Sequence, residues 1–165
     1  MIDSKTLDPN FKFLIAQEPG GENIMRCFSC GTCTAGCPVR EVTDVYNPRR
    51  IIRMALLGMK KDVLSSQFIW LCSSCYTCFE RCPQDVKVPE LMNAIKNIAV
   101  REGYIPPSMK IQLDLLSSFG RLLELTDFEN EKREESGLPR IEGKTEDVKK
   151  ILEELGFHRE EKTEG

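Results

Sequence analysis

The residues of this chain best suited to chemistry are its eight cysteines, which form two copies of one motif. Both copies read C-x2-C-x2-C-x3-C-P, and the second lies 45 residues after the first. The members are Cys27, Cys30, Cys33 and Cys37 before Pro38, and Cys72, Cys75, Cys78 and Cys82 before Pro83. Thiolates are strong ligands for soft metals, so this many cysteines in a reducing compartment indicate metal binding.

Three cysteines at this spacing bring their sulfurs together in one tight loop, which suits three irons of a [4Fe–4S] cube. The same run occurs in bacterial ferredoxins, where the fourth cysteine ligates the other cluster. The same assignment of ligands here predicts two crossed ligand sets, in which each cluster takes three cysteines from one run and the fourth from the other. The first cluster takes Cys27, Cys30, Cys33 and Cys82, and the second takes Cys72, Cys75, Cys78 and Cys37.

Two structural zinc sites and a disulfide framework are the alternative interpretations. Zinc sites usually combine CxxC pairs or Cys/His sets, each supplying half of a tetrahedron. Three ligands within seven residues, twice, with a proline after each run, fit that pattern poorly. A reducing cytosol disfavours disulfides.

The ligand count limits what this chain does. Four thiolates saturate each cluster, so no iron keeps an open position and no cysteine remains as a nucleophile. The single histidine, His158, lies in a charged tail, which removes most histidine-based catalysis. We therefore expect an electron carrier without catalytic residues of its own.

The elements that must position the cysteines read as helices, and strand-like alternation is nearly absent. Asn47 and Pro48 are suited to begin a helix after the first run, and Pro89 opens another after the second. We expect a further helix capped by Ser108, whose apolar stripe from Leu115 to Leu123 is core, and a last amphipathic helix after Thr145. The fold class is therefore all-α.

Composition divides the chain further. Residues 1–126 hold 15 Lys and Arg against 13 Asp and Glu, whereas residues 127–165 hold 8 against 13. Arg49, Arg50 and Arg53 belong to a local basic excess, which either offsets anionic clusters or is a solvated helix face. We expect an irregular, extended N-terminal segment over residues 1–24 and a cluster domain over residues 25–125. Residues 126–165 should then contain an exposed linker, 127–145, followed by the amphipathic helix.

Location and partners follow from what the sequence lacks. A secretory signal and a run of about 18 apolar residues are both missing, so we expect a cytoplasmic protein with no membrane span. The acidic chain carries no nucleic-acid-binding motif, so nucleic acid is not an expected partner.

Three stretches together resemble the C subunit of heterodisulfide reductase, over residues 25–103. They are CFSCGTCTAGCP, YNPRRIIRMALLG and IWLCSSCYTCFERCPQDVKVPELMNAIKNIAVREG. The cysteine pattern alone is shared with iron–sulfur subunits of succinate dehydrogenase, fumarate reductase and 2-hydroxy-acid dehydrogenases, and with bacterial sulfur-oxidising complexes. These remain the alternative functions.

The resemblance implies an α-helical ferredoxin fold in which the eight cysteines match the family's ligands. It also implies a soluble oxidoreductase complex of methanogenesis. In that complex, electrons pass from the A subunit, which holds flavin and iron–sulfur clusters, through the C subunit to the catalytic B subunit. The B subunit cleaves the disulfide of coenzyme M and coenzyme B. A hydrogenase or formate dehydrogenase feeds the complex.

Overall fold

The computed structural model describes residues 4–141, 143 and 145–156, and His158 lies outside them. Every regular element in these described ranges is a helix, as the all-α prediction requires. The chain separates into two compact units, Met1–Tyr104 and Ile105–Gly165. The boundary that we expected at residue 125 falls inside the second unit.

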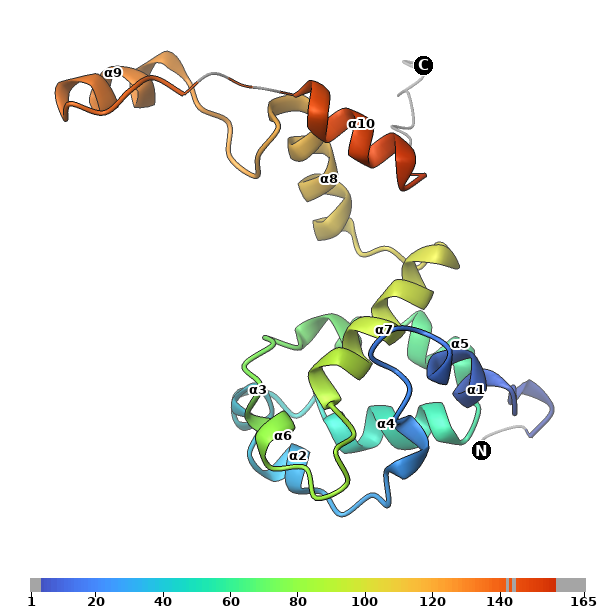
Figure 1. The fold of residues 1–165 in the computed structure, drawn as a ribbon. Coiled ribbons are helices and arrows are strands. Elements are labelled where there is room, and N and C mark those ends of the chain that lie inside the picture. Colours follow the sequence, from blue (N-terminus) through green and yellow to red (C-terminus); the bar gives the residue numbers. More distant parts are fainter. Residues whose placement is uncertain (1–3, 142, 144, 157–165) are drawn as a thin grey trace. The chain divides into compact units, whose positions relative to one another are not determined.

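Unit 1 is a set of short helices around two longer ones (Figure 1). Its elements are η1 (Ser4–Thr6), α1 (Phe11–Ala16), η2 (Ile24–Arg26), α2 (Thr32–Ala35), α3 (Pro38–Val42), α4 (Pro48–Leu56), α5 (Lys60–Leu64), η3 (Phe68–Leu71), α6 (Thr77–Glu80) and α7 (Val88–Arg101). Helices α4 and α7 each follow one cysteine run, and α1 packs against both.

One hydrophobic core lies between these helices. Helix α4 contributes Ile51, Ile52 and Ala55, and α7 contributes an apolar stripe that includes Leu91 and Ile95, all buried. The spacing of three and four residues is that of one face of a helix. Since the half-buried cysteines pack against this same core, the core supports the cysteine loops directly.

The start of α4 is fixed by side-chain chemistry, as the Asn47–Pro48 prediction requires. Asn47 Oδ1 accepts hydrogen bonds from the Arg50 backbone N–H at 3.0 Å and from the Thr34 hydroxyl at 2.9 Å. Thr34 Oγ1 in turn accepts the Arg49 backbone N–H at 3.0 Å. Because Thr34 lies in α2, these bonds fasten the first cysteine loop to the N-terminus of α4.

The N-terminal segment is not irregular, which corrects our expectation. It contains α1, whose Phe11 and Ile15 are fully buried in the core. The preceding turn is held where the Asp8 N–H donates to the Gly58 carbonyl oxygen at 2.7 Å. Spacing of four residues between the two apolar side chains places them on one helix face, which is why the segment folds against the body.

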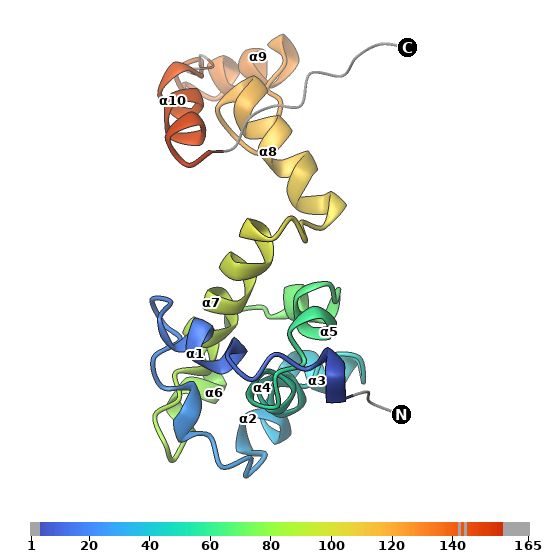
Figure 2. The same cartoon turned by 90° about the vertical axis from the view of Figure 1, so that its right-hand side faces the viewer.

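Unit 2 contains α8 (Pro107–Phe119), α9 (Asp127–Glu135) and α10 (Glu146–Glu154). Helix α10 lies beside α8 (Figure 2). No residue of α8 is buried, so the prediction of a core stripe is wrong for this helix, which begins at Pro107 and ends at Phe119. The expected linker is also partly wrong, because α9 forms there with a capping box between Thr126 and Glu129.

Among the described residues, none of the helices combines the length and the apolar character that crossing a membrane requires.

Candidate metal centre

The first cysteine loop runs from the end of η2 into α2. Cys27 is the residue after η2, and Cys33 lies within α2. Between them, Ser29 and Gly31 adopt left-handed backbone conformations with φ of 61° and 92°. Two left-handed residues within three positions curl the chain tightly, so the sulfurs of this loop turn toward a common space.

The second loop repeats this conformation, 45 residues later. Ser74 and Tyr76 take the left-handed positions with φ of 52° and 61°, and Cys78 lies within α6 as Cys33 lies within α2. The left-handed Tyr76 stands where the first loop has a glycine. The repeat in sequence is therefore a repeat in backbone conformation.

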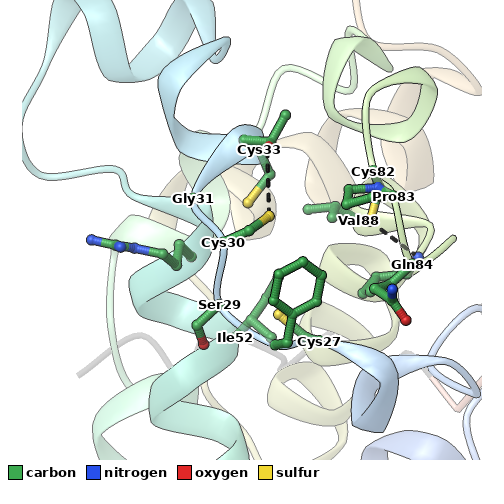
Figure 3. Close-up of a pocket in the computed structure, with 14 residues that line it drawn as sticks. Cys27, Ser29, Cys30, Gly31, Cys33, Ile52, Cys82, Pro83, Gln84 and Val88 are labelled. Atoms are coloured by element: carbon green, nitrogen blue, oxygen red, sulfur yellow. Dashed lines mark hydrogen bonds between the residues drawn. The ribbon is translucent and has the colours of Figure 1, made fainter.

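Four cysteines line one pocket, three from the first loop and one from the second (Figure 3). They are Cys27, Cys30, Cys33 and Cys82. Cys82 reaches the pocket from the turn between α6 and α7, and its sulfur accepts the Val86 backbone N–H at 3.4 Å. The apolar part of the lining includes Ile52 and Val88.

The other four cysteines are Cys37 of the first run and Cys72, Cys75 and Cys78 of the second. Cys78 interacts electrostatically with Cys72 and Cys75 of its own loop, and also with Cys33. Cys72, Cys37 and Cys78 each contribute to the electrostatic environment of the buried Tyr46. Helices α2 and α6 pack against each other, which holds the two cysteine loops side by side.

In each loop, an exposed thiol and a half-buried thiol have pKa values shifted in opposite directions. The Thr32 hydroxyl, 3.4 Å from the Cys30 sulfur, lowers the pKa of Cys30, and Thr77 at 3.6 Å does the same for Cys75. Burial raises the pKa of Cys33, and raises that of Cys78 to about 12. Neighbouring thiols reinforce both increases, because like charges disfavour ionisation.

Two arginines lie against glycines of the first cysteine run. The Arg49 side chain is 3.6 Å from the position of a Cβ built on Gly31, and Arg49 lines the first pocket. The Arg81 guanidinium is 2.6 Å from the corresponding position on Gly36. Arg49 is exposed, and its side chain borders the first cysteine pocket.

Sequence reasoning missed Tyr46. This residue is 2% exposed, and Cys72 and Cys37 are among the groups near its hydroxyl. Burial raises the pKa of Tyr46 far above its usual range, and the neighbouring Cys72 raises it further.

The donor set fits an iron–sulfur cluster. All eight cysteines are free thiols, which removes the disulfide framework. In the described part of the chain, no three His, Cys, Asp or Glu side chains are grouped closely enough to hold a single ion. A four-iron cluster instead takes one thiolate on each iron, and four cysteines around one partly apolar pocket offer that arrangement.

Comparison with known proteins identifies this motif. Residues 23–86 match the family described as a 4Fe-4S dicluster domain. Since that family holds two clusters and the chain supplies eight cysteines at ferredoxin spacing, the chain binds two [4Fe–4S] clusters. The prediction of the cofactors is confirmed.

Curated relatives are similar over most of the chain. The C subunit of the H(2):CoB-CoM heterodisulfide,ferredoxin reductase of Methanothermobacter thermautotrophicus is 34% identical over 95% of this chain and 88% of its own length. The iron-sulfur C2 subunit of the CoB–CoM heterodisulfide reductase of Methanocaldococcus jannaschii is 35% identical, over 88% and 81%. The C subunit of the Ferredoxin:CoB-CoM heterodisulfide reductase of Methanosarcina mazei is 37% identical, over 82% and 83%.

Proposed function

The chain belongs to the family of heterodisulfide reductase C subunits, and from this premise we propose that it relays electrons from the flavin-containing A subunit to the catalytic B subunit of that complex. Membership confirms the resemblance seen in the cysteine runs, and it makes the chain an iron–sulfur electron-transfer subunit of an oxidoreductase. The proposed acceptor reaction is cleavage of the coenzyme M–coenzyme B disulfide in the catalytic subunit. A hydrogenase or formate dehydrogenase supplies the electrons to the flavin-containing subunit.

The observation that carries this proposal is that the cluster sites use every cysteine of the chain. Disulfide cleavage needs a thiolate or a metal that engages substrate sulfur. With all thiolates bound to iron, this chain offers neither, so the chemistry belongs to a partner. The clusters, when bound, supply two one-electron centres in series.

We propose the crossed ligand sets, Cys27, Cys30, Cys33 and Cys82 for the first cluster and Cys72, Cys75, Cys78 and Cys37 for the second. The shared pocket supports the first set, and the electrostatic environment of Tyr46 supports the second. This assignment of ligands also constrains the distance between the clusters. Each cluster would join both halves of the repeat, so the chain holds the two clusters at a fixed separation.

We further propose that the fold is the α-helical ferredoxin, with the cluster domain within residues 25–125. The helical elements of the described residues and the two core helices that follow the cysteine runs support this assignment. Residues 1–24 then brace the domain through α1, and residues 126–165 are an appended segment. We place the complex in the cytoplasm, since eight thiol ligands stay reduced there.

Anaerobic reconstitution tests the function. The purified chain should contain about eight iron and eight sulfide ions, as two four-iron cubes require. The flavin-containing and catalytic subunits, supplied with an electron donor, should reduce the heterodisulfide with this chain and lose that activity without it. A matched control is the chain whose cysteines are all changed to serine.

Two results would overturn the proposal. One is heterodisulfide reduction by the holo chain without the catalytic subunit, since the chain would then catalyse the reaction itself. The other is full activity of the two partner subunits in the absence of this chain, because no relay would then be needed.

A further inference from the structure

One peptide group of the chain faces the sulfur of Cys82. The peptide that joins Asp85 to Val86 donates its N–H to this sulfur at 3.4 Å (Figure 3). Its carbonyl oxygen, that of Asp85, accepts the side-chain amide of Asn23 at 2.8 Å. Both ends of the peptide are therefore hydrogen-bonded, one to a proposed cluster ligand and the other to a side chain 62 residues away along the chain.

The backbone on both sides of this peptide has an uncommon conformation. Asp85 and Lys87 are left-handed, with φ of 49° and 54°, which few residues other than glycine adopt. Val86 lies between them, is 2% exposed and packs into the hydrophobic core. The buried Val86 side chain holds the turn in place, so the fold itself directs the N–H toward the sulfur.

Asn23 connects this turn to the beginning of the first cysteine run. Its carbonyl oxygen accepts the Arg26 N–H at 3.0 Å as η2 begins, and η2 ends directly before Cys27. The half-buried Asn23 side chain does not cap η2, and it reaches across to the turn after Cys82 instead. One residue thus links two segments that supply proposed ligands of the first cluster.

The corresponding turn of the first run is built differently. Four residues after Cys37, the Glu41 N–H donates to the Cys37 carbonyl oxygen at 3.1 Å, as in the first turn of a helix. Four residues after Cys82, the N–H donates to the sulfur. The reason is that the chain continues as α3 from Pro38, whereas it turns after Pro83. The two runs therefore differ at their fourth cysteines.

We infer that Asn23 raises the reduction potential of the first cluster through the Asp85–Val86 peptide. The inference rests on the proposed ligand sets and so on the proposed function. Reduction adds one electron, whose charge spreads onto the ligand sulfurs, and an N–H donated to a sulfur stabilises that charge. A hydrogen bond accepted by the carbonyl of the same peptide polarises it and strengthens its N–H as a donor. Asn23 acts through the peptide, so it is a positioning residue.

The test is a redox titration of the holo protein with dithionite and mediators, followed by electron paramagnetic resonance. Asn23→Leu removes the donor at similar side-chain size. The first cluster should become about threefold harder to reduce, or about 28 mV at 59 mV per tenfold for one electron. The second cluster should keep its potential. The variant Cys30→Ser identifies which signal belongs to the first cluster.

Asn97→Leu is the matched control, because Asn97 is an exposed asparagine on α7. It should leave both potentials unchanged. A second variant replaces Val86 by its α-hydroxy analogue, which keeps the side chain and turns the peptide into an ester without an N–H. Direct loss of the donor should make the first cluster about tenfold harder to reduce, about 59 mV.

A measurement on the wild type serves if a variant fails to retain its clusters. Pulsed electron paramagnetic resonance of holo protein labelled with ¹⁵N-valine should show a nitrogen coupled to the signal of the first cluster, through the Val86 N–H and the Cys82 sulfur. Absence of that coupling overturns the inference, because the peptide would then not contact the cluster ligand.

The outcomes separate the two proposals. A wild type without about eight irons contradicts the proposed function. A wild type with those irons, whose first potential is the same in Asn23→Leu, overturns only the role of Asn23. An equal fall of both potentials in Asn23→Leu also overturns it, since the effect would then come from the whole fold.

Discussion

At the scale of residues, each cysteine run places its sulfurs at two depths. Cys30 and Cys75 are exposed, whereas the other six cysteines are half-buried against the core. The exposed cysteine is the second of the four cysteines in each run, and it directly follows a serine with a left-handed backbone conformation. These two ligands are therefore the parts of the cluster sites that a docking partner meets first.

Exchange of a single ligand tests the crossed wiring. Cys82→Ser should disturb the cluster held by Cys27, Cys30 and Cys33, because its fourth iron loses a thiolate. The electron paramagnetic resonance signal altered in Cys82→Ser should be the one altered in Cys30→Ser. It should differ from the signal altered in Cys75→Ser. A shared signal between Cys82→Ser and Cys75→Ser would show instead that each run holds its own cluster.

At the scale of elements, local chemistry decided which helices could be predicted. The start of α4 was predictable because Asn47 and Pro48 act within one turn. Helix α9 was missed because its signal is a capping box, Thr126 with Glu129, and it has no apolar stripe. The left-handed Tyr76 follows only from its equivalence to Gly31, since a bulky residue rarely adopts that conformation.

The docking of α1 depends on Gly58, which accepts the Asp8 N–H and has φ of 81°. An added Cβ at Gly58 would collide with the Asp8 backbone, whereas one at Gly103, with φ of 82°, meets nothing within 4 Å. Both alanine variants carry the left-handed penalty of about 1 kcal/mol. We expect Gly58→Ala to cost a further ~1–3 kcal/mol, because the N-terminal segment must shift.

Thermal unfolding followed by circular dichroism measures this difference. About 1 kcal/mol corresponds to a fall of about 3 °C in Tm for a chain of this size. Equal falls for Gly58→Ala and Gly103→Ala would mean that the contact with Asp8 does not support the fold.

At the scale of the whole molecule, burial and chemistry are concentrated in one unit. The buried hydrophobic residues of the described chain lie between Phe11 and Ala99, and all eight cysteines lie within that span. The two clusters could be predicted from the sequence, because the spacing of the cysteines defines their loops. Tyr46 and the extent of unit 1 could not, because both depend on contacts between residues distant along the chain.

Unit 1 should therefore hold both clusters without unit 2. A chain that ends at Tyr104 keeps every buried hydrophobic residue described, so we expect about eight iron and eight sulfide ions and the full-length Tm. The matched control removes residues 1–16, a shorter deletion that takes Phe11 and Ile15 out of the core. Loss of two large core side chains costs about 2–5 kcal/mol each, so this variant should fail to retain iron. If the chain ending at Tyr104 lost iron while the shorter deletion retained it, cluster binding would depend on residues 105–165 and the core around α1 would be dispensable.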